Sequence, residues 1–370
     1  MPIVMWSVFA LVLGLIVGSF LNVLVARLPH EKSIVWPSSR CFSCFKKIRF
    51  FDNMPILGYL RLRGKCRFCG VPYSARYLWV EVGTGLAFLV LFLLDVVVNL
   101  HGLPGVQMKV VGASPLPPGP AIALFLYHAF LVACLIAAAA IDAEHRVIPP
   151  LIPYTGVLVG IVGGALMPWP FPHAAAAANV IPAGNPWTLP EYWGKIPMGA
   201  QPWPFWGPTF SFAPPGSLQM GLLNGVLGAL AGSFVVRVVK WLFEVGFGKE
   251  ALGLGDADLL MMAGAFLGWQ IAVLSLFMGA CAALVLKLPG LLASLAGKDV
   301  DHELPFGPGL ALGVVVSWLS WPWLGARMQF VFFDTTVLGV VVVIMVVGML
   351  AAGLLLRRPE PEPAETAPTP

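Results

Sequence analysis

Charged residues are scarce in this 370-residue chain, where Asp, Glu, Lys and Arg make up 11% of the positions and hydrophobic residues 58%. Soluble domains typically carry about 25% charged residues. A chain this poor in charge cannot give a soluble domain its polar surface, which excludes an ordinary soluble enzyme. The composition therefore indicates a polytopic membrane protein.

Two further features are missing. The first apolar run has no A-x-A-like cleavage site, and the opening "MPIVMWS" contains no Lys or Arg. We therefore expect a retained helix there, and not a signal peptide that is removed. The chain also lacks a glycine-rich nucleotide fingerprint of the Rossmann kind.

Nine apolar runs are long enough to be considered as helices crossing roughly 30 Å of hydrocarbon. The shortest of them is 257–270. Together they predict an all-α polytopic membrane protein of about eight to nine transmembrane helices, at 3–26, 78–100, 120–141, 151–167, 217–238, 257–270, 271–288, 308–325 and 331–356.

Basic residues predict the orientation in the membrane. The loop after the first run holds 11 of the chain's 22 Lys and Arg, and loops rich in these residues stay in the cytoplasm. Alternating from there puts the segments 101–119 and 168–216, with one Lys each, outside. The chain is thus expected to run from an external N-terminus to a cytoplasmic C-terminus.

This pattern predicts six regions. They are a first transmembrane helix (1–26), a cytoplasmic four-cysteine zinc-binding domain (27–77), transmembrane helices that include Asp142 (78–167), a long external loop rich in Pro and Trp (168–216), transmembrane helices with a Gly-x-Gly-Asp motif (217–356) and a disordered, acidic cytoplasmic tail (357–370).

Four of the six cysteines form two C-x-x-C pairs separated by 21 residues: Cys41, Cys44, Cys66 and Cys69. Two close pairs of thiolates suit a tetrahedral Zn²⁺. A pair of redox dithiols is the alternative, but such enzymes work on the oxidising side of the membrane, whereas this loop is expected in the cytoplasm. The pattern therefore favours zinc. Cys134 and Cys281 lie in apolar runs and are expected to be small buried residues.

Two carboxylates stand at the ends of apolar runs. Asp142 closes the third run, and Asp256 follows Gly253 and Gly255, which have no Cβ and could let an extended backbone pass close by. Both ends are expected at the cytoplasmic face, so the two side chains could meet there. The alternative is that both are boundary residues in headgroup water, with Asp256 as a helix N-cap.

Two carboxylates that share one proton can hydrolyse a peptide bond, because the ionised one takes a proton from water while the other donates to the carbonyl oxygen. A transporter would instead place acidic residues near the middle of the bilayer, in paired broken helices. A non-enzymatic scaffold, held to secretion partners by its zinc loop, would tolerate loss of either aspartate.

Five motifs, taken in order, resemble one family. They are "GSFLNVLVARLP" (Gly18 to Pro29), the four-cysteine loop continuing to Glu81, Asp142 ahead of "VIPP", "GKEALGLGDADLL" with Asp256, and "LPFGPGLALG" (Leu304 to Gly313). They resemble the type IV prepilin peptidases, also called prepilin leader peptidase/N-methyltransferases, of the Gly-x-Gly-Asp class of intramembrane aspartic proteases. Asp258 stands where many members have Lys, and Pro150 where many have Asp.

The resemblance implies that Asp142 and Asp256 remove the short basic leader from type IV prepilins or type II secretion pseudopilins. The reaction would take place at the cytoplasmic face of the bacterial inner membrane. In many members the new N-terminal residue is then methylated with S-adenosylmethionine. Candidate substrate contacts are Gly253, Gly255, Asp258, Glu144 and Glu250. We expect membrane lipid but no nucleic acid as a partner, and make no prediction of oligomeric state.

Overall fold

A computed structural model describes residues 2–101, 108, 117–167, 212–213, 217–248, 252–295, 306–333 and 335–356. Apart from two isolated β-bridges in the four-cysteine region and a bridge residue at Ala213, the regular structure in these ranges is helical. The elements are α1 (Pro2–Arg27), η1 (Leu28–His30), η2 (Phe50–Asp52), α2 (Leu57–Leu62), α3 (Arg76–Phe92), η3 (Leu93–Val98), α4 (Gly119–His145), α5 (Leu151–Leu166), α7 (Leu218–Phe247), α8 (Leu254–Leu267), α9 (Trp269–Leu295), α10 (Phe306–Phe333) and α11 (Thr335–Leu356).

The prediction of an all-α polytopic membrane protein is confirmed. Within the described residues, six helical segments are long and apolar enough to cross a membrane: Ile3–His30, Arg76–Val98, Gly119–His145, Leu218–Phe247, Trp269–Ser294 and Thr336–Leu355. The apolar run 308–325 lies within α10. The runs 151–167 and 257–270 correspond to α5 and α8, which have 16 and 14 residues. Both are shorter than the roughly 20 residues that a helix needs to cross.

Helix α8 is an interior element. Most of its side chains are buried, and it contacts α4, α5, α7, α9 and α10. It ends at Gly268, whose φ of 90° is a conformation that L side chains rarely adopt. The apolar character of 257–270 therefore reflects burial among other helices.

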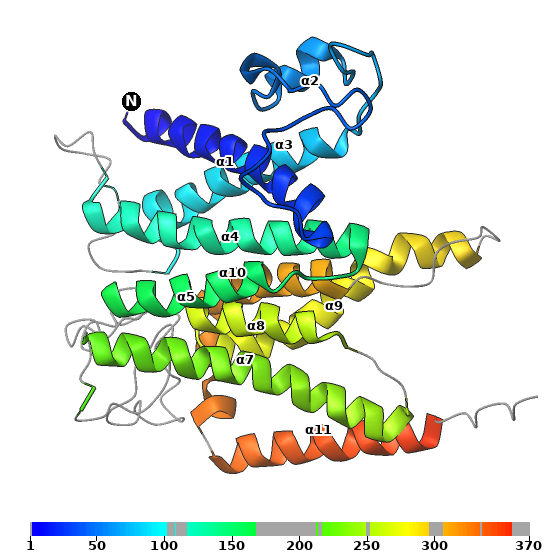
Figure 1. Cartoon of the computed structure of the whole chain (residues 1–370). Coiled ribbons are helices and arrows are strands. Elements are labelled where there is room, and N and C mark those ends of the chain that lie inside the picture. The colour runs from blue at the N-terminus through cyan, green and yellow to red at the C-terminus, as the bar shows by residue number, and fades with distance from the viewer. Residues whose placement is uncertain are drawn as a thin grey trace, which may run out of the picture.

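Figure 1 shows the helices lying side by side in one bundle, with α1 and α3 near the four-cysteine region and α11 at the opposite edge. Helix α4 lies next to α1 and α3. The middle of the bundle is formed by α10, α9, α8 and α5. Glycines let the middle helices approach closely: a Cβ added to Gly264 of α8 would lie 2.0 Å from the carbonyl oxygen of Gly228 in α7. Such small-residue contacts are typical of packing between membrane helices.

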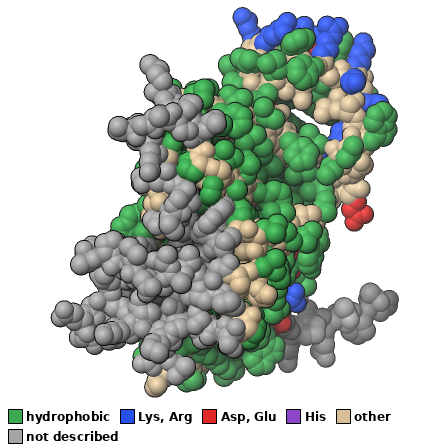
Figure 2. All heavy atoms as spheres, turned by 90° about the vertical axis from the view of Figure 1, so that its left-hand side faces the viewer, with side chains coloured by type: hydrophobic (Ala, Val, Ile, Leu, Met, Phe, Trp, Pro, Cys, Tyr) green, Lys and Arg blue, Asp and Glu red, His purple; other side chains and the backbone are tan. Residues whose placement is uncertain are grey.

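The surface divides into two regions. In Figure 2 the Lys and Arg side chains gather over the four-cysteine region at the top, while hydrophobic side chains cover most of the helical bundle. Cys134 is buried as expected, but the expectation for Cys281 is wrong, because this side chain is exposed on α9. Its position faces away from the helical core, so an apolar sequence around it did not imply burial. Most of 168–216 and all of 357–370 lie outside the described residues.

Candidate active site

Asp142 lies in the last turn of α4 and meets the start of α10. It is 8% exposed, and its Oδ2 accepts a hydrogen bond of 2.9 Å from the backbone N–H of Gly307, the second residue of α10. The last turn of a helix disfavours negative charge, whereas the first turn favours it. The start of α10 therefore compensates for the unfavourable position of Asp142 in its own helix.

Asp256 is the third residue of α8 and is 6% exposed. Its Oδ2 accepts a hydrogen bond of 3.1 Å from the backbone N–H of Gly253. The carboxylate thus satisfies one of the N–H groups that a helix start leaves free, and the dipole of α8 favours its charge. Gly253 is the N-cap residue here, and Asp256 lies three positions inside the helix.

The two aspartates are brought together by contacts among α4, α8 and α10. Their charges are close enough to interact. The turn that follows Asp142 also packs on the Gly-x-Gly-Asp segment, because a Cβ added to Gly255 would lie 3.0 Å from Cβ of Ile148. Gly255 therefore allows a close approach between the two Asp-bearing segments.

Each carboxylate is held through Oδ2 by the N–H of a glycine at a helix start. This arrangement fixes both side chains and, within the part of the chain that the structure describes, leaves Oδ1 of each for a shared proton, water or substrate. Two buried, interacting carboxylates held in this way can act as a general acid and a general base.

Gly307 is required at its position by the close approach of Asp142. A Cβ there would lie 2.6 Å from Oδ2 and 2.8 Å from Cγ of that carboxylate, so Gly307→Ala must displace it. We expect leader removal to slow by about 10- to 100-fold, since small displacements of catalytic groups carry penalties of this order. The rate is compared with that of Gly83→Ala, because a Cβ at Gly83 meets nothing within 4 Å. Equal rates for the two variants would contradict this account of Gly307.

The three acidic residues predicted to contact the substrate are Glu144, Asp258 and Glu250. Glu144 forms an ion pair with Arg76 at the start of α3. Asp258 lies 3.9 Å from Arg237 of α7, measured from Oδ1 to Nη2. Glu250 lies outside the described residues. The roles of Glu144, Asp258 and Glu250 in substrate binding stay predictions.

The four predicted cysteine ligands converge, with all sulfur atoms within 4.8 Å of one another. The Cys41–Cys69 and Cys44–Cys66 sulfur pairs are 3.8 and 4.0 Å apart. Sulfur atoms about 2.3 Å from a tetrahedral Zn²⁺ would lie about 3.8 Å from one another. The spacing of the cluster therefore fits a metal ion of this size.

The two C-x-x-C turns have the same backbone conformation. In each, the N–H of the first cysteine donates to the carbonyl of the residue five positions later, at 3.0 Å for Cys41 and 2.8 Å for Cys66. The residue after each second cysteine, Phe45 or Gly70, has a positive φ. Backbone N–H groups of Cys69 and Phe68 lower the pKa of the Cys66 thiol to about 6. This favours the metal-binding thiolate form of Cys66, whereas at Cys44 the backbone N–H of Lys46, which lowers the pKa, is outweighed by desolvation and the other cysteine sulfurs, which raise it to about 11.

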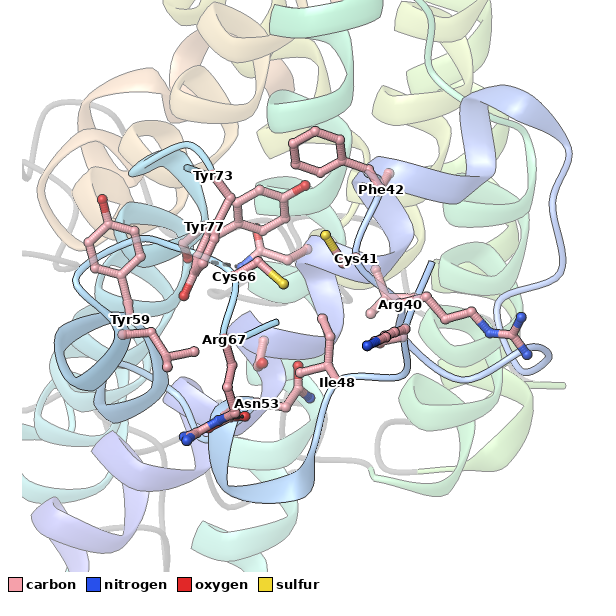
Figure 3. A pocket seen from close by; sticks show the side chains of 18 of the residues that line it. Arg40, Cys41, Phe42, Ile48, Asn53, Tyr59, Cys66, Arg67, Tyr73 and Tyr77 are labelled. Carbon is pink, nitrogen blue, oxygen red and sulfur yellow. Dashed lines mark hydrogen bonds and ion pairs between the residues drawn. The ribbon is translucent and has the colours of Figure 1, made fainter. Parts of the chain in front are cut away.

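A cavity of about 250 Å³ lies between the four-cysteine region, the end of α1 and the start of α3. Figure 3 shows Tyr59, Tyr73, Tyr77 and Phe42 around it, together with Cys41 and Cys66. One side is closed by Asp52 and Arg67, whose hydrogen bonds are 2.7 and 2.5 Å long. The Arg67 guanidinium holds the pKa of Asp52 below its usual range through these bonds.

Comparison with known proteins links these features to one family. The profile described as "Bacterial Peptidase A24 N-terminal domain" matches residues 12–94, and the profile described as "Type IV leader peptidase family" matches 205–288. A prepilin leader peptidase/N-methyltransferase of Myxococcus xanthus (strain DK1622) is 30% identical over 315 residues, which cover 85% of this chain and 72% of the relative. This chain belongs to the type IV leader peptidase family.

Further relatives of this type IV leader peptidase carry the same name. The protein of Burkholderia pseudomallei (strain 1026b) is 29% identical over 339 residues, covering 85% of each chain, and that of Klebsiella pneumoniae is 30% identical over 285 residues, covering 75% of this chain and 92% of the relative. No solved structure matched. Asp256 falls within the second family match, whereas Asp142 lies between the two matches, and the contact of α4 with α8 is what relates the two residues in space.

Sequence reasoning missed several residues at the sites of this peptidase. Gly307 was visible only as part of the "LPFGPG" motif, with no role attached, and Arg76 was one basic residue among many. Asn22, which lines the cavity, sits in the apolar first helix. A polar residue inside an apolar run is the one signal that could have marked it.

Proposed function

We propose that the chain removes the basic leader of type IV prepilins or type II secretion pseudopilins, with Asp142 and Asp256 as the catalytic pair. The observation that carries this assignment is the convergence of two buried carboxylates, each held by a glycine N–H at a helix start. Membership of the leader peptidase family and the names of its relatives agree with it.

The two carboxylates can divide the proton transfers of peptide-bond hydrolysis between them. One carboxylate is ionised and takes a proton from a water molecule as the water attacks the scissile carbonyl carbon. The other is protonated and donates to the carbonyl oxygen. As the tetrahedral intermediate collapses, one carboxyl group gives its proton to the leaving nitrogen while the other carboxylate takes back the proton from the oxygen that becomes the carbonyl again, so the pair ends with its single shared proton.

The position of the pair suits a substrate that is half polar and half apolar. Asp256 stands at the start of α8 and Asp142 at the end of α4, where the bundle meets the aqueous phase. We infer that this is the cytoplasmic face of the bacterial inner membrane, because the basic four-cysteine region leads into the same ends of α1 and α3. The leader would stay in water while the apolar helix of the substrate remains in lipid.

We also propose that Glu144, Asp258 and Glu250 attract the basic leader, and that Gly253 and Gly255 flank its backbone. Glu144 and Asp258 already have the basic neighbours Arg76 and Arg237, which a leader lysine or arginine could replace. Charge reversal at all three acidic positions should raise the KM for a basic leader by about tenfold or more, with a smaller change for a neutral leader. Equal effects on both leaders would contradict electrostatic recognition.

A second activity is proposed for the same chain, namely methylation of the new N-terminus. S-adenosylmethionine would supply the methyl group. We infer that Cys41, Cys44, Cys66 and Cys69 hold a structural Zn²⁺, which the sulfur spacing fits. Four thiolates close the coordination shell, so the ion would organise the cytoplasmic region without taking part in chemistry.

The experiment is leader removal by the purified full-length protein in detergent, with a prepilin carrying a basic leader and the products identified by mass. We expect one cut between the leader and the apolar helix, and a further gain of one methyl group when S-adenosylmethionine is added. An uncut prepilin, or a cut within the apolar helix, would contradict the proposed peptidase.

A further inference from the structure

The four-cysteine region carries an exposed segment that neither the aspartate pair nor the sulfur cluster explains. Residues 45–51, the FKKIRFF segment, include three aromatic residues, three basic residues and no acidic residue. The aromatic side chains are turned outward: Phe45, Phe50 and Phe51 are 70%, 79% and 64% exposed. Large apolar side chains that stay exposed together, with charges around them, mark a surface that binds another molecule.

The three basic residues of the segment have no acidic partner. All three side chains are exposed, and Lys46 and Arg49 lie over the ring of Phe68, at 5.1 and 5.5 Å from its centroid. Neither these two residues nor Lys47 forms an ion pair within the part of the chain that the structure describes. Their charges are therefore available to a partner.

The surrounding region has a large excess of positive charge. Residues 27–77 contain 11 Lys and Arg but only two acidic residues, Glu31 and Asp52. Asp52 is already paired with Arg67, at 2.5 Å between Oδ1 and Nη2. The region as a whole thus attracts molecules or surfaces of negative charge.

Phe45 is held in a backbone conformation that suits glycine. Its φ is 56°, and bulky residues rarely adopt a positive φ. The residue at the same place after the second C-x-x-C pair is Gly70, with a φ of 70°. An aromatic residue is kept where glycine would form the turn with less strain. This indicates that the exposed ring of Phe45 has a role outside the turn.

The four-cysteine region lies beside the helical bundle. It connects two segments that can span the membrane, Ile3–His30 and Arg76–Val98, so it stays close to the membrane surface. The helices run across Figure 1, and the region around α2 lies above α1 and α3 at the edge of the bundle. Figure 2 looks along the helices and shows Lys, Arg and hydrophobic side chains beyond that edge. The lipid around α1 and α3 is therefore the nearest large surface.

The sign of the charge distinguishes the candidate partners. A basic leader would be repelled by the FKKIRFF segment, so binding of the proposed substrate does not explain it. Aromatic rings beside Lys and Arg are typical of segments at a membrane surface, where the rings enter the headgroup level and the basic groups meet anionic phosphates. An acidic protein would also match the charges, but it is not held next to the segment as the lipid is.

We propose that the FKKIRFF segment docks the four-cysteine region on anionic phospholipids beside α1 and α3. The three aromatic rings enter the headgroup level, and the three basic side chains contact lipid phosphates. This inference does not depend on the aspartate pair, on the metal or on methylation.

The test uses the full-length protein in lipid nanodiscs, made of phosphatidylcholine alone or with phosphatidylglycerol added. Hydrogen exchange of the peptides that contain 45–51 is followed by mass. We expect exchange to be at least about fivefold slower with the anionic lipid. The difference should disappear at about 1 M salt, where charges more than about 3 Å apart are largely screened.

Two charge variants test whether the segment itself binds the lipid. Lys47→Glu with Arg49→Glu should abolish the slowing by phosphatidylglycerol. Arg61→Glu with Arg63→Glu is the matched control, because it changes the charge equally at exposed positions of the same region, and it should keep most of the slowing. An unchanged unfolding temperature shows that each variant is folded.

Phe45→Gly tests the aromatic contribution. It should keep the turn, because Gly70 serves the other turn with the same sign of φ, and it should weaken the slowing of exchange. Equal exchange in the two lipids, or equal loss of slowing in the two charge variants, would overturn the proposal. If polyglutamate added to phosphatidylcholine nanodiscs slows exchange more than phosphatidylglycerol does, the surface belongs to an acidic protein and not to lipid.

Discussion

Asp256→Asn will slow leader removal by about 10²–10⁴-fold, and Asp142→Asn will do the same, because each substitution removes a general acid or base. Asparagine keeps the size of the side chain and can still accept the glycine N–H that holds each carboxylate. It cannot carry the shared proton. The measurement is the single-turnover rate of leader cleavage, followed by mass.

The matched control for the aspartates is Glu244→Gln, which removes one carboxylate of α7 that pairs with Lys240 at 3.5 Å. This variant should cut the leader at the wild-type rate. All variants should insert in the membrane and unfold at similar temperatures. Wild-type cleavage by either aspartate variant would mean that these residues are boundary residues and not catalytic ones.

Removing the metal will have the second large effect. We expect wild type to contain one Zn²⁺ per chain, and Cys66→Ser to contain none, since loss of one of four thiolates opens the closed site. The ion would organise the cytoplasmic region, so methylation of the new N-terminus should fall at least tenfold with the metal. Leader removal should change far less, because the aspartate pair lies on α4 and α8.

Cys281→Ser is the control for the zinc experiment, because this cysteine is exposed on α9 and lies outside the cluster. It should keep both the metal content and the methylation rate of wild type. Metal content is measured by atomic emission on the purified protein. An unchanged zinc content in Cys66→Ser would show that the cluster is not the zinc site.

Much of the architecture could be read from the sequence, because apolar runs, basic loops and paired cysteines carry direct physical constraints. The C-x-x-C pairs predicted a four-sulfur cluster, and the sulfur atoms do converge. The apolar run 257–270 predicted a helix, but it did not show whether that helix spans the membrane or lies buried among the other helices. A buried interior helix and a membrane span have the same composition, and only the contacts of α8 distinguish them.

The active site could be predicted only in part. Asp142 and Asp256 stood out because carboxylates are costly inside membrane helices, so one beside an apolar run marks either function or a helix end near water. The role of Gly307 could not be predicted, since it depends on a contact with Asp142 across 165 positions. The buried hydrogen bond between Asp95 and His128, 2.7 Å long, was missed for the same reason. Local patterns do not encode which distant helix start meets which side chain.

The most direct test of the central claim compares Asp142→Asn, Asp256→Asn and the double variant in single-turnover leader cleavage. If the two carboxylates act as one unit, the double variant will be no slower than the slower single variant, because either change alone disables the pair. Multiplication of the two single effects in the double variant would contradict a shared catalytic pair.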